Sequence, residues 1–141
     1  MVAGKNVSAS GCVILAHNED DVTDVPTKSS YVPAQNGNNG YYWIEIAGLE
    51  VADSFFNDCH VGVVSNKCTS RDENMKEGGV LYEVRLTIAQ KAKTAREAVE
   101  IAGRLVEEKG YRHNGRSYII ADENEAWVMS LVGGKNWIAQ R

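Results

Sequence analysis

The chain has few cysteines, little positive charge and no long apolar run, and each shortage excludes a class of protein. Its three cysteines are an odd number without CxxC spacing, so neither a disulfide framework nor a zinc ribbon is indicated. No apolar stretch approaches the roughly 20 residues that a membrane span needs, and residues 1–5 do not resemble a signal peptide. Fifteen Lys and Arg face 19 Asp and Glu without forming a basic cluster. We therefore expect neither a nucleic acid nor a membrane as partner.

The remaining composition is that of an ordinary globular domain. Hydrophobic residues make up 43% of 141 residues and charged residues 24%, which suits a single domain with its own core. The sequence contains no internal repeat. Residues 20–40 hold both prolines and the polar stretch QNGNNG, so we expect them to form one surface loop. Composition leaves the cellular compartment open, whether cytoplasmic or secreted.

Hydrophobic patterns predict short strands and two helices. Strands are expected at 1–7, 12–17, 41–46, 61–66, 117–121, 126–132 and 137–139. Residues 80–92 form a loosely periodic helical pattern. A second helix follows Thr94, whose spacing to Glu97 is that of a capping box, and Gly110 stands where a left-handed cap would end it. The order predicts an α+β fold, a mainly antiparallel sheet with two helices on one side.

Three polar groups could carry chemistry: HNED at 17–20, NDCH at 57–60 and SNKC at 65–68. Each also has a purely structural interpretation, as a solvated strand end, turn-forming asparagines or buried cysteines. His17, Cys59, His60 and Cys68 are ligand types that zinc accepts, but adjacent residues of an extended strand point to opposite faces. A Cys–His pair for thiol catalysis is also conceivable, but the sequence places no Cys within reach of His17 or His60. The three tryptophans fall in strand patterns, so we expect them in the core or on a face of the sheet rather than at a ligand site. Composition and spacing alone therefore give a fold class and no function.

An ordered set of segments carries further information. These are GKNVSASG (4–11), AHNED (16–20), WIEIAGLEVADS (43–54), VVSNKCTSR (63–71), AKTARE (92–97), IADENEAW (120–127) and GKNWIAQR (134–141). In order and with close spacing, they resemble the cysteine dipeptidases of the N-terminal-nucleophile hydrolase superfamily. These enzymes are relatives of the secernins and, more distantly, of penicillin V acylase and bile salt hydrolase. The resemblance covers nearly the whole chain except residues 21–40.

The resemblance implies a fold that is part of a four-layer αββα sandwich and an N-terminal Cys as nucleophile. By the register of Gly4 and Lys5, that Cys would lie three positions before Met1. Family members are several times longer, so residues 1–141 are expected to be the N-terminal portion of one truncated domain. On its own the chain is then expected to be inactive. The resemblance implies no metal and no organic cofactor.

The resemblance also assigns roles to three residues. His17 stands where the family commonly has Arg, and would hold the nucleophile or a substrate carboxylate by charge-assisted hydrogen bonds. Asp20 would receive and orient the α-amino group of the nucleophile. Asn66 would donate into an oxyanion hole. Asn57 is expected to shape the turn before the fourth strand.

Two other functions remain open from the sequence. One is an amide hydrolase of the same superfamily that acts on acyl-amino-acid or β-lactam side-chain amides. The other is a non-catalytic domain that binds peptides or assembles with a partner. Half a sandwich leaves a sheet face uncovered. The expected partners are therefore a small peptide substrate, the remainder of the full-length chain and a second copy.

Overall fold

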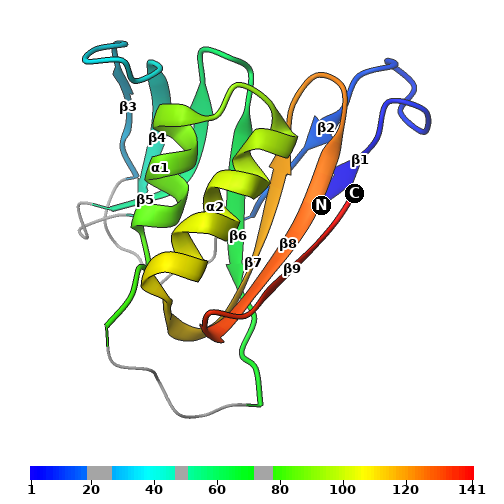
Figure 1. The fold of residues 1–141 in the computed structure, drawn as a ribbon. Helices are drawn as coiled ribbons and strands as arrows, with labels where there is room; N and C mark the ends of the chain where they lie inside the picture. Colours follow the sequence, from blue (N-terminus) through cyan, green and yellow to red (C-terminus); the bar gives the residue numbers. More distant parts are fainter. Residues whose placement is uncertain (19–26, 47–50, 72–77) are drawn as a thin grey trace.

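The computed structural model describes residues 1–18, 27–46, 51–71 and 78–141. Within these ranges a short hairpin stands apart from a seven-stranded sheet, and two helices accompany the sheet (Figure 1). The hairpin strands are β1 (Val2–Ala3) and β2 (Ile14–Leu15). The sheet strands are β3 (Ser29–Val32), β4 (Tyr41–Ile46), β5 (Val51–Asn57), β6 (Gly62–Lys67), β7 (Tyr111–Ala121), β8 (Ala126–Gly134) and β9 (Trp137–Gln140). The helices are α1 (Glu83–Lys91) and α2 (Ala95–Lys109).

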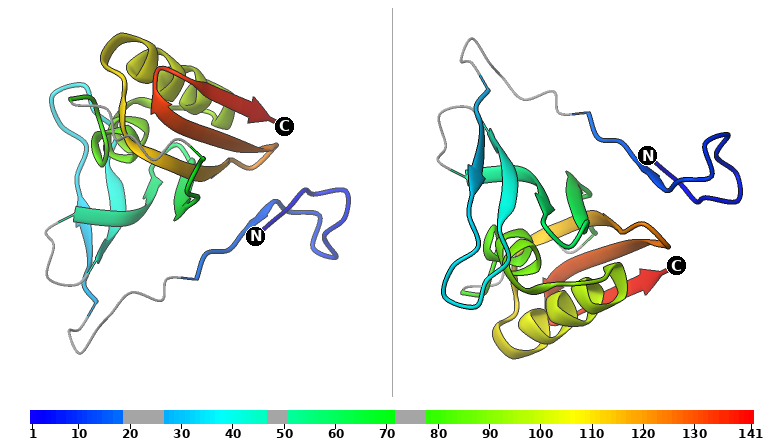
Figure 2. Two further views of the ribbon diagram at one scale, coloured as in Figure 1. Left: turned by 90° about the horizontal axis from the view of Figure 1, so that it is seen from below. Right: turned by 90° about the horizontal axis from the view of Figure 1, so that it is seen from above.

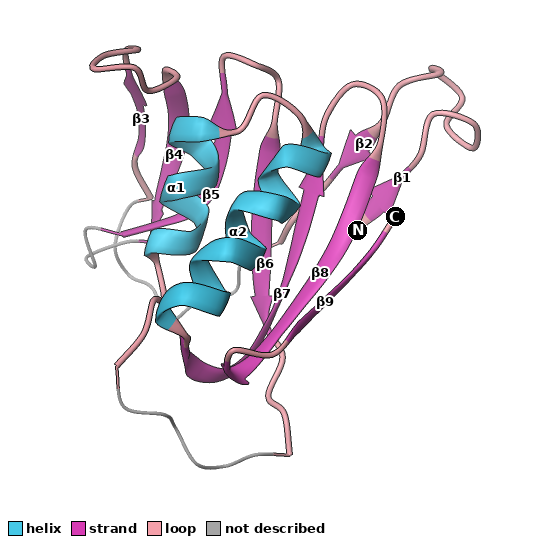
Figure 3. Ribbon diagram, viewed as in Figure 1, coloured by secondary structure: helices cyan, strands magenta, loops and turns pink. Residues whose placement is uncertain are grey.

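The sheet runs in sequence order from β3 to β9, and every neighbouring pair is antiparallel. Both helices lie in the connection between β6 and β7, and they cover one face of the sheet (Figure 3). The β1–β2 hairpin lies on the opposite side of the sheet (Figure 2). Neither of the described helices is long and apolar enough to cross a membrane. The predicted α+β class, with a mainly antiparallel sheet and two helices, is confirmed.

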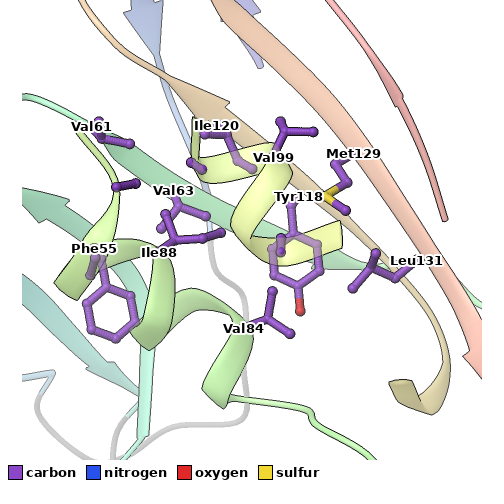
Figure 4. Close-up of a cluster of buried hydrophobic side chains, with 14 of the residues drawn as sticks. Phe55, Val61, Val63, Val84, Ile88, Val99, Tyr118, Ile120, Met129 and Leu131 are labelled. Carbon is purple, nitrogen blue, oxygen red and sulfur yellow. The ribbon is translucent and has the colours of Figure 1, made fainter. Parts of the chain in front are cut away.

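The core lies between the sheet and the helices because side chains alternate along each strand. Inward positions of the strands meet the buried stripes of the helices (Figure 4). The residues labelled there are Phe55, Val61, Val63, Val84, Ile88, Val99, Tyr118, Ile120, Met129 and Leu131. All three tryptophans, Trp43, Trp127 and Trp137, pack against this cluster, as the strand patterns predicted.

The other face of the sheet carries large apolar side chains in contact with solvent. Exposed fractions reach 57% for Tyr42, 50% for Phe56 and 70% for Ile138. A groove of about 830 Å³ separates this face from the β1–β2 hairpin, and Leu15 and Val64 line it from the two sides. Among the described residues, therefore, only the helix-bearing face of the sheet is fully packed.

Helix α2 begins much as its sequence predicts. The Thr94 hydroxyl accepts from the Glu97 N–H at 3.1 Å. The Glu97 carboxylate binds the N–H of Lys93, one residue before the expected partner. Gly110 follows the last turn with φ of 79° and an extended ψ of 162°, so it is a glycine-specific end but not the left-handed α cap that was predicted.

The strand predictions were less accurate. Predicted strands 1–7 and 12–17 shrink to β1 and β2, and β3 lies inside the predicted loop, part of which falls outside the described residues. β5 was not predicted, because its core-facing positions include the polar Asp53 and Asn57, which breaks the apolar alternation. β7 begins at Tyr111 rather than at 117. A register shift between Tyr111 and Gly115 interrupts its pattern.

The first prediction concerns Gly103, which lies on α2 against Trp137 of β9. A Cβ at this position would stand 2.5 Å from Cζ2 of the indole. Gly103→Ala should therefore lower the free energy of unfolding by about 1–2 kcal/mol, although alanine is normally the better helix former by about 1 kcal/mol. Urea denaturation measures this. The exposed neighbour Arg104→Ala should shift stability by less than about 0.5 kcal/mol. In a Trp137→Phe background the cost of Gly103→Ala should shrink, and a Gly103→Ala protein more stable than wild type would contradict the packing.

The second prediction concerns Asp122 in the β7–β8 turn. Its carboxylate accepts from the N–H groups of Ala95 (2.7 Å), Asn124 (2.7 Å) and Glu125 (2.9 Å). Although burial raises the pKa of Asp122, these three bonds lower it below the usual value on balance. A lowered folded-state pKa gives stability that is present above about pH 4 and is lost as the pH falls through that folded-state pKa.

Asp122→Asn should therefore cost about 1 kcal/mol at pH 7, a modest value because the group is largely solvated. The difference from wild type should vanish in acid. Urea denaturation at pH 7, 5 and 3 tests this, with the exposed carboxylate change Glu108→Gln as control. A cost that does not depend on pH would show that the charge of Asp122 plays no part.

Candidate functional site

The sheet is irregular where β5 passes between β4 and β6. In the ladder between β4 and β5, Ile44 lies opposite Ser54 while Glu45 lies opposite Ala52, so Asp53 is the extra residue of a β-bulge. In the described ladder between β5 and β6, the pairs are Phe55 with Val63 and Phe56 with Gly62. β6 meanwhile stays paired with β7 as far as Lys67. Bulges bend a strand and redirect its side chains, and they are frequent beside active sites.

The bulge residue is bound by an arginine from the helix layer. Arg85 of α1 is 1% exposed. Its Nη1 atom donates to the carbonyl oxygen of Asp53 at 2.6 Å, to Oδ1 of Asp53 at 2.8 Å and to Oγ of Ser65 at 2.9 Å. Burying a guanidinium is costly unless it is paired and hydrogen-bonded, and Asp53 supplies both requirements.

The second oxygen of Asp53 faces the N-terminal layer. Its Oδ2 atom lies 3.0 Å from Nδ1 of His17, and it also accepts from the Ser54 hydroxyl at 2.9 Å. The side chains of His17 and Asp53 are only 9% and 6% exposed. His17 lies two residues beyond β2, so this contact joins the hairpin to the sheet. An ionised Asp53 carboxylate can only accept, so a hydrogen bond across this contact would use a proton on Nδ1 of His17.

His17, Asp53, Ser65 and Arg85 form a buried polar cluster, and a second arginine extends this cluster along the sheet. Arg116 of β7 donates from Nη1 to the Ser65 hydroxyl at 3.0 Å, so Ser65 receives two guanidinium groups. Nearby, the hydroxyl of Tyr118 donates to that of Tyr111 at 3.5 Å. Burial raises the pKa of Tyr118 well above its ordinary value, and it raises the pKa of Tyr111 as well. Both phenols are therefore neutral near pH 7, and among the described residues Asp53 is the anionic partner of Arg85.

The three predicted site residues do not share one environment in the structure. His17 joins the buried cluster through Asp53. Asn66 is exposed on β6, and alternation puts its side chain on the face away from the helices, whereas its neighbour Ser65 faces Arg85. Asp20 lies outside the described residues. Asn66 of β6 and His17 beyond β2 are thus connected indirectly. Ser65, the neighbour of Asn66, binds Arg85, Arg85 binds Asp53, and Asp53 contacts His17.

The other polar groups have structural roles. Asn57 is 1% exposed, and its amide donates to the carbonyls of Ala89 and Ala92 at the end of α1. Its oxygen accepts from the N–H groups of Cys59 and Val61, which confirms its predicted role in shaping the turn. The three cysteines are all free thiols. Across the described ranges no three His, Cys, Asp or Glu side chains are grouped as metal ligands.

Asp53, Arg85 and Arg116 were not predicted as site residues, and Ser65 was predicted only as a member of the polar group SNKC. One signal was available for Arg85. It interrupts the apolar pattern of α1 and occupies the buried stripe with Val84, Ile88 and Ala89. A charged residue inside a buried stripe requires a partner of opposite charge, and that partner is Asp53.

Several known proteins are similar to this chain in sequence. The family described as Peptidase family C69 matches residues 62–141. The "Dipeptidase" of Bifidobacterium longum is 46% identical over 72 residues, covering 50% of this chain and 13% of that protein. A "Probable dipeptidase A" of Streptococcus pyogenes is 27% identical over 124 residues, covering 87% of this chain and 26% of that protein. A "Probable dipeptidase" of Latilactobacillus sakei is 24% identical, covering 100% of this chain and 36% of that protein.

The chain thus spans between 13% and 36% of the length of these relatives. The family match extends from the start of β6 to the end of the chain and includes both helices. It contains Ser65, Asn66, Arg85 and Arg116 of the site region. By this match over more than half of its length, the chain belongs to peptidase family C69.

Proposed function

We propose that the whole protein containing this chain is a dipeptidase that cleaves small peptides by acyl transfer to an N-terminal cysteine. Membership of a peptidase family and relatives named as dipeptidases support the reaction class. The observation that carries the cysteine mechanism is the pairing of the first residue with the strand that leads to His17.

The register of the hairpin relates the start of the chain to His17. The N-terminal amine of Met1 donates to the carbonyl of Ala16 at 2.8 Å, and the N–H of Ala16 donates back at 3.0 Å. Val2 and Ala3 lie opposite Leu15 and Ile14. Continuing this antiparallel register puts the residue before Met1 opposite His17. Residues two apart share a face, so the residue three positions before Met1 would share the face of His17. Such diagonal neighbours lie roughly 7–8 Å apart.

That position is the one the sequence resemblance gives to the nucleophilic Cys. A free α-amine titrates near pH 8, so it can take the proton of the adjacent thiol near neutrality. The thiolate attacks the peptide carbonyl carbon, and the C–N bond breaks as the leaving amine receives the proton. Water then attacks the thioester, which releases the acid and regenerates the thiol. Asp20 would hold the α-ammonium form between these transfers.

His17 and Asn66 would assist from the protein side. His17 would bind the nucleophile or the substrate carboxylate, with its orientation set in the buried cluster. Asn66 would donate its amide N–H to the oxyanion of the tetrahedral intermediate. Its exposure on the face away from the helices leaves that amide accessible to a substrate. None of these steps requires a metal or an organic cofactor.

The third prediction tests the mechanism in the full-length protein whose processed first residue is the proposed Cys. Replacing that Cys by Ala should abolish dipeptide hydrolysis. Asn66→Ala should reduce kcat by about 10²- to 10³-fold, the usual cost of losing one oxyanion donor. Asn6→Ala, an exposed asparagine in the hairpin, is the matched control and should leave kcat unchanged. Full activity without the Cys would refute the mechanism.

A panel of dipeptides, tripeptides, acyl-amino acids and β-lactams defines the substrate class in the same assay. A clear preference for dipeptides supports the proposal. Faster cleavage of acyl-amino acids or β-lactams would identify an amidase of the same chemistry instead, and binding of peptides without any turnover would identify a non-catalytic domain.

We also propose that the exposed apolar face is covered in the full-length protein by the remainder of its chain. The fourth prediction follows: on its own, the 141-residue chain should self-associate at micromolar concentration, because Phe56, Val128 and Ile138 stay in contact with water. Ile138→Glu should weaken the association in sedimentation velocity. Glu108→Ala, on the exposed side of α2, should not. A monomer at these concentrations would count against the proposal.

A further inference from the structure

We propose that Asp53, held by Arg85, is a positioning residue that orients His17 for catalysis. The activity readout rests on the proposed cysteine mechanism, whereas the spectroscopic readout described below does not. The proposal concerns residues that neither the family match nor the names of the relatives assign to any role.

The first argument is that the two carboxylate oxygens of Asp53 bind different partners. Oδ1 and the main-chain carbonyl bind Arg85. Oδ2 binds His17 and the Ser54 hydroxyl. Both the carboxylate and the carbonyl of Asp53 are thus held by an arginine that is 1% exposed, and the carboxylate also accepts from a neighbouring serine. Because Asp53 is held at several points, it can fix the position of the His17 ring that it contacts.

The second argument is the effect on His17. An imidazole has two nitrogens, and a partner that accepts from Nδ1–H decides both the tautomer and the rotation of the ring. With Nδ1 committed to Asp53, any chemistry of His17 runs through Nε2. A ring that must bind a nucleophile or a carboxylate gains from this, because a displacement of about 1 Å in an active site can cost about 10²-fold in rate.

The third argument is that the buried Asp53–Arg85 pair gives little net stability that would explain it as a purely structural feature. Buried ion pairs are often no more stabilising than apolar residues of similar size. Here the pair also occupies a bulge in β5 and a position in the apolar stripe of α1. Such local departures from regular structure are expected where a protein positions a functional group.

The activity test is a double-mutant cycle in the full-length enzyme. Asp53→Asn alone should lower kcat by about 10- to 100-fold with a smaller change in KM. In a His17→Ala background, the same change should cost less than about threefold, because its effect acts through His17. His17→Arg should restore much of the activity lost in His17→Ala, since a guanidinium can also bind Asp53. Equal costs of Asp53→Asn in both backgrounds would overturn the proposal.

The second test does not depend on the reaction. The ¹⁵N spectrum of the three histidines should show Nδ1 of His17 protonated even at pH 8, where a free neutral imidazole is mostly protonated at Nε2. Asp53→Asn should move His17 toward the free pattern and leave His60 and His113 unchanged. If Asp53→Asn does not fold, Asp53→Glu keeps the charge, displaces the carboxylate and should shift the same signal. An unaltered His17 spectrum in the folded variant would refute the positioning role even if the enzyme is a dipeptidase.

Discussion

The ion pair between Asp53 and Arg85 is the contact on which the site region depends. It joins a strand to a helix at a place where the sheet itself is irregular, with a bulge in β5 beside the end of the described β5–β6 ladder. Removing either partner would leave a charge buried without compensation, which usually costs about 3–5 kcal/mol. The bulge, the buried arginine and the contact with His17 therefore form one unit, because all three meet at Asp53.

This unit also explains how the two sides of the sheet are connected. The helices pack on one face, and the N-terminal hairpin lies over the other. Continuous backbone pairing seals a sheet, so a side chain from one layer normally does not reach the other. Beside Asp53 the described part of the ladder with β6 holds the pairs Phe55–Val63 and Phe56–Gly62, and His17 from the hairpin side reaches a carboxylate that is held from the helix side. The irregularity that weakens the sheet locally is what allows this contact.

The sequence predicted the parts of the fold that local chemistry decides. Helix α2 could be placed because Thr94 and Glu97, close together in the chain, mark its start and Gly110 marks its end. β5 could not, because Asp53 and Asn57 face the core and its apolar pattern is lost. His17 was found through a sequence motif. Its partner Asp53 was missed as a site residue, since the contact with Arg85 joins residues 32 apart and depends on how the helix crosses the sheet. No local pattern encodes that crossing.

The two faces of β6 show how the site is divided. Ser65 points toward the helices and binds both arginines, while the adjacent Asn66 points to the open face. A change in the buried cluster would thus reach Asn66 through the backbone of one strand, but it would reach His17 directly through its contact with Asp53. The orientation of His17 is therefore set by groups already enclosed in this chain. In the proposed mechanism the groups that contact a substrate lie on the open face, where Asn66 and the apolar side chains are exposed. The packed side of the sheet thus fixes the orientation of His17, and the open side leaves Asn66 accessible.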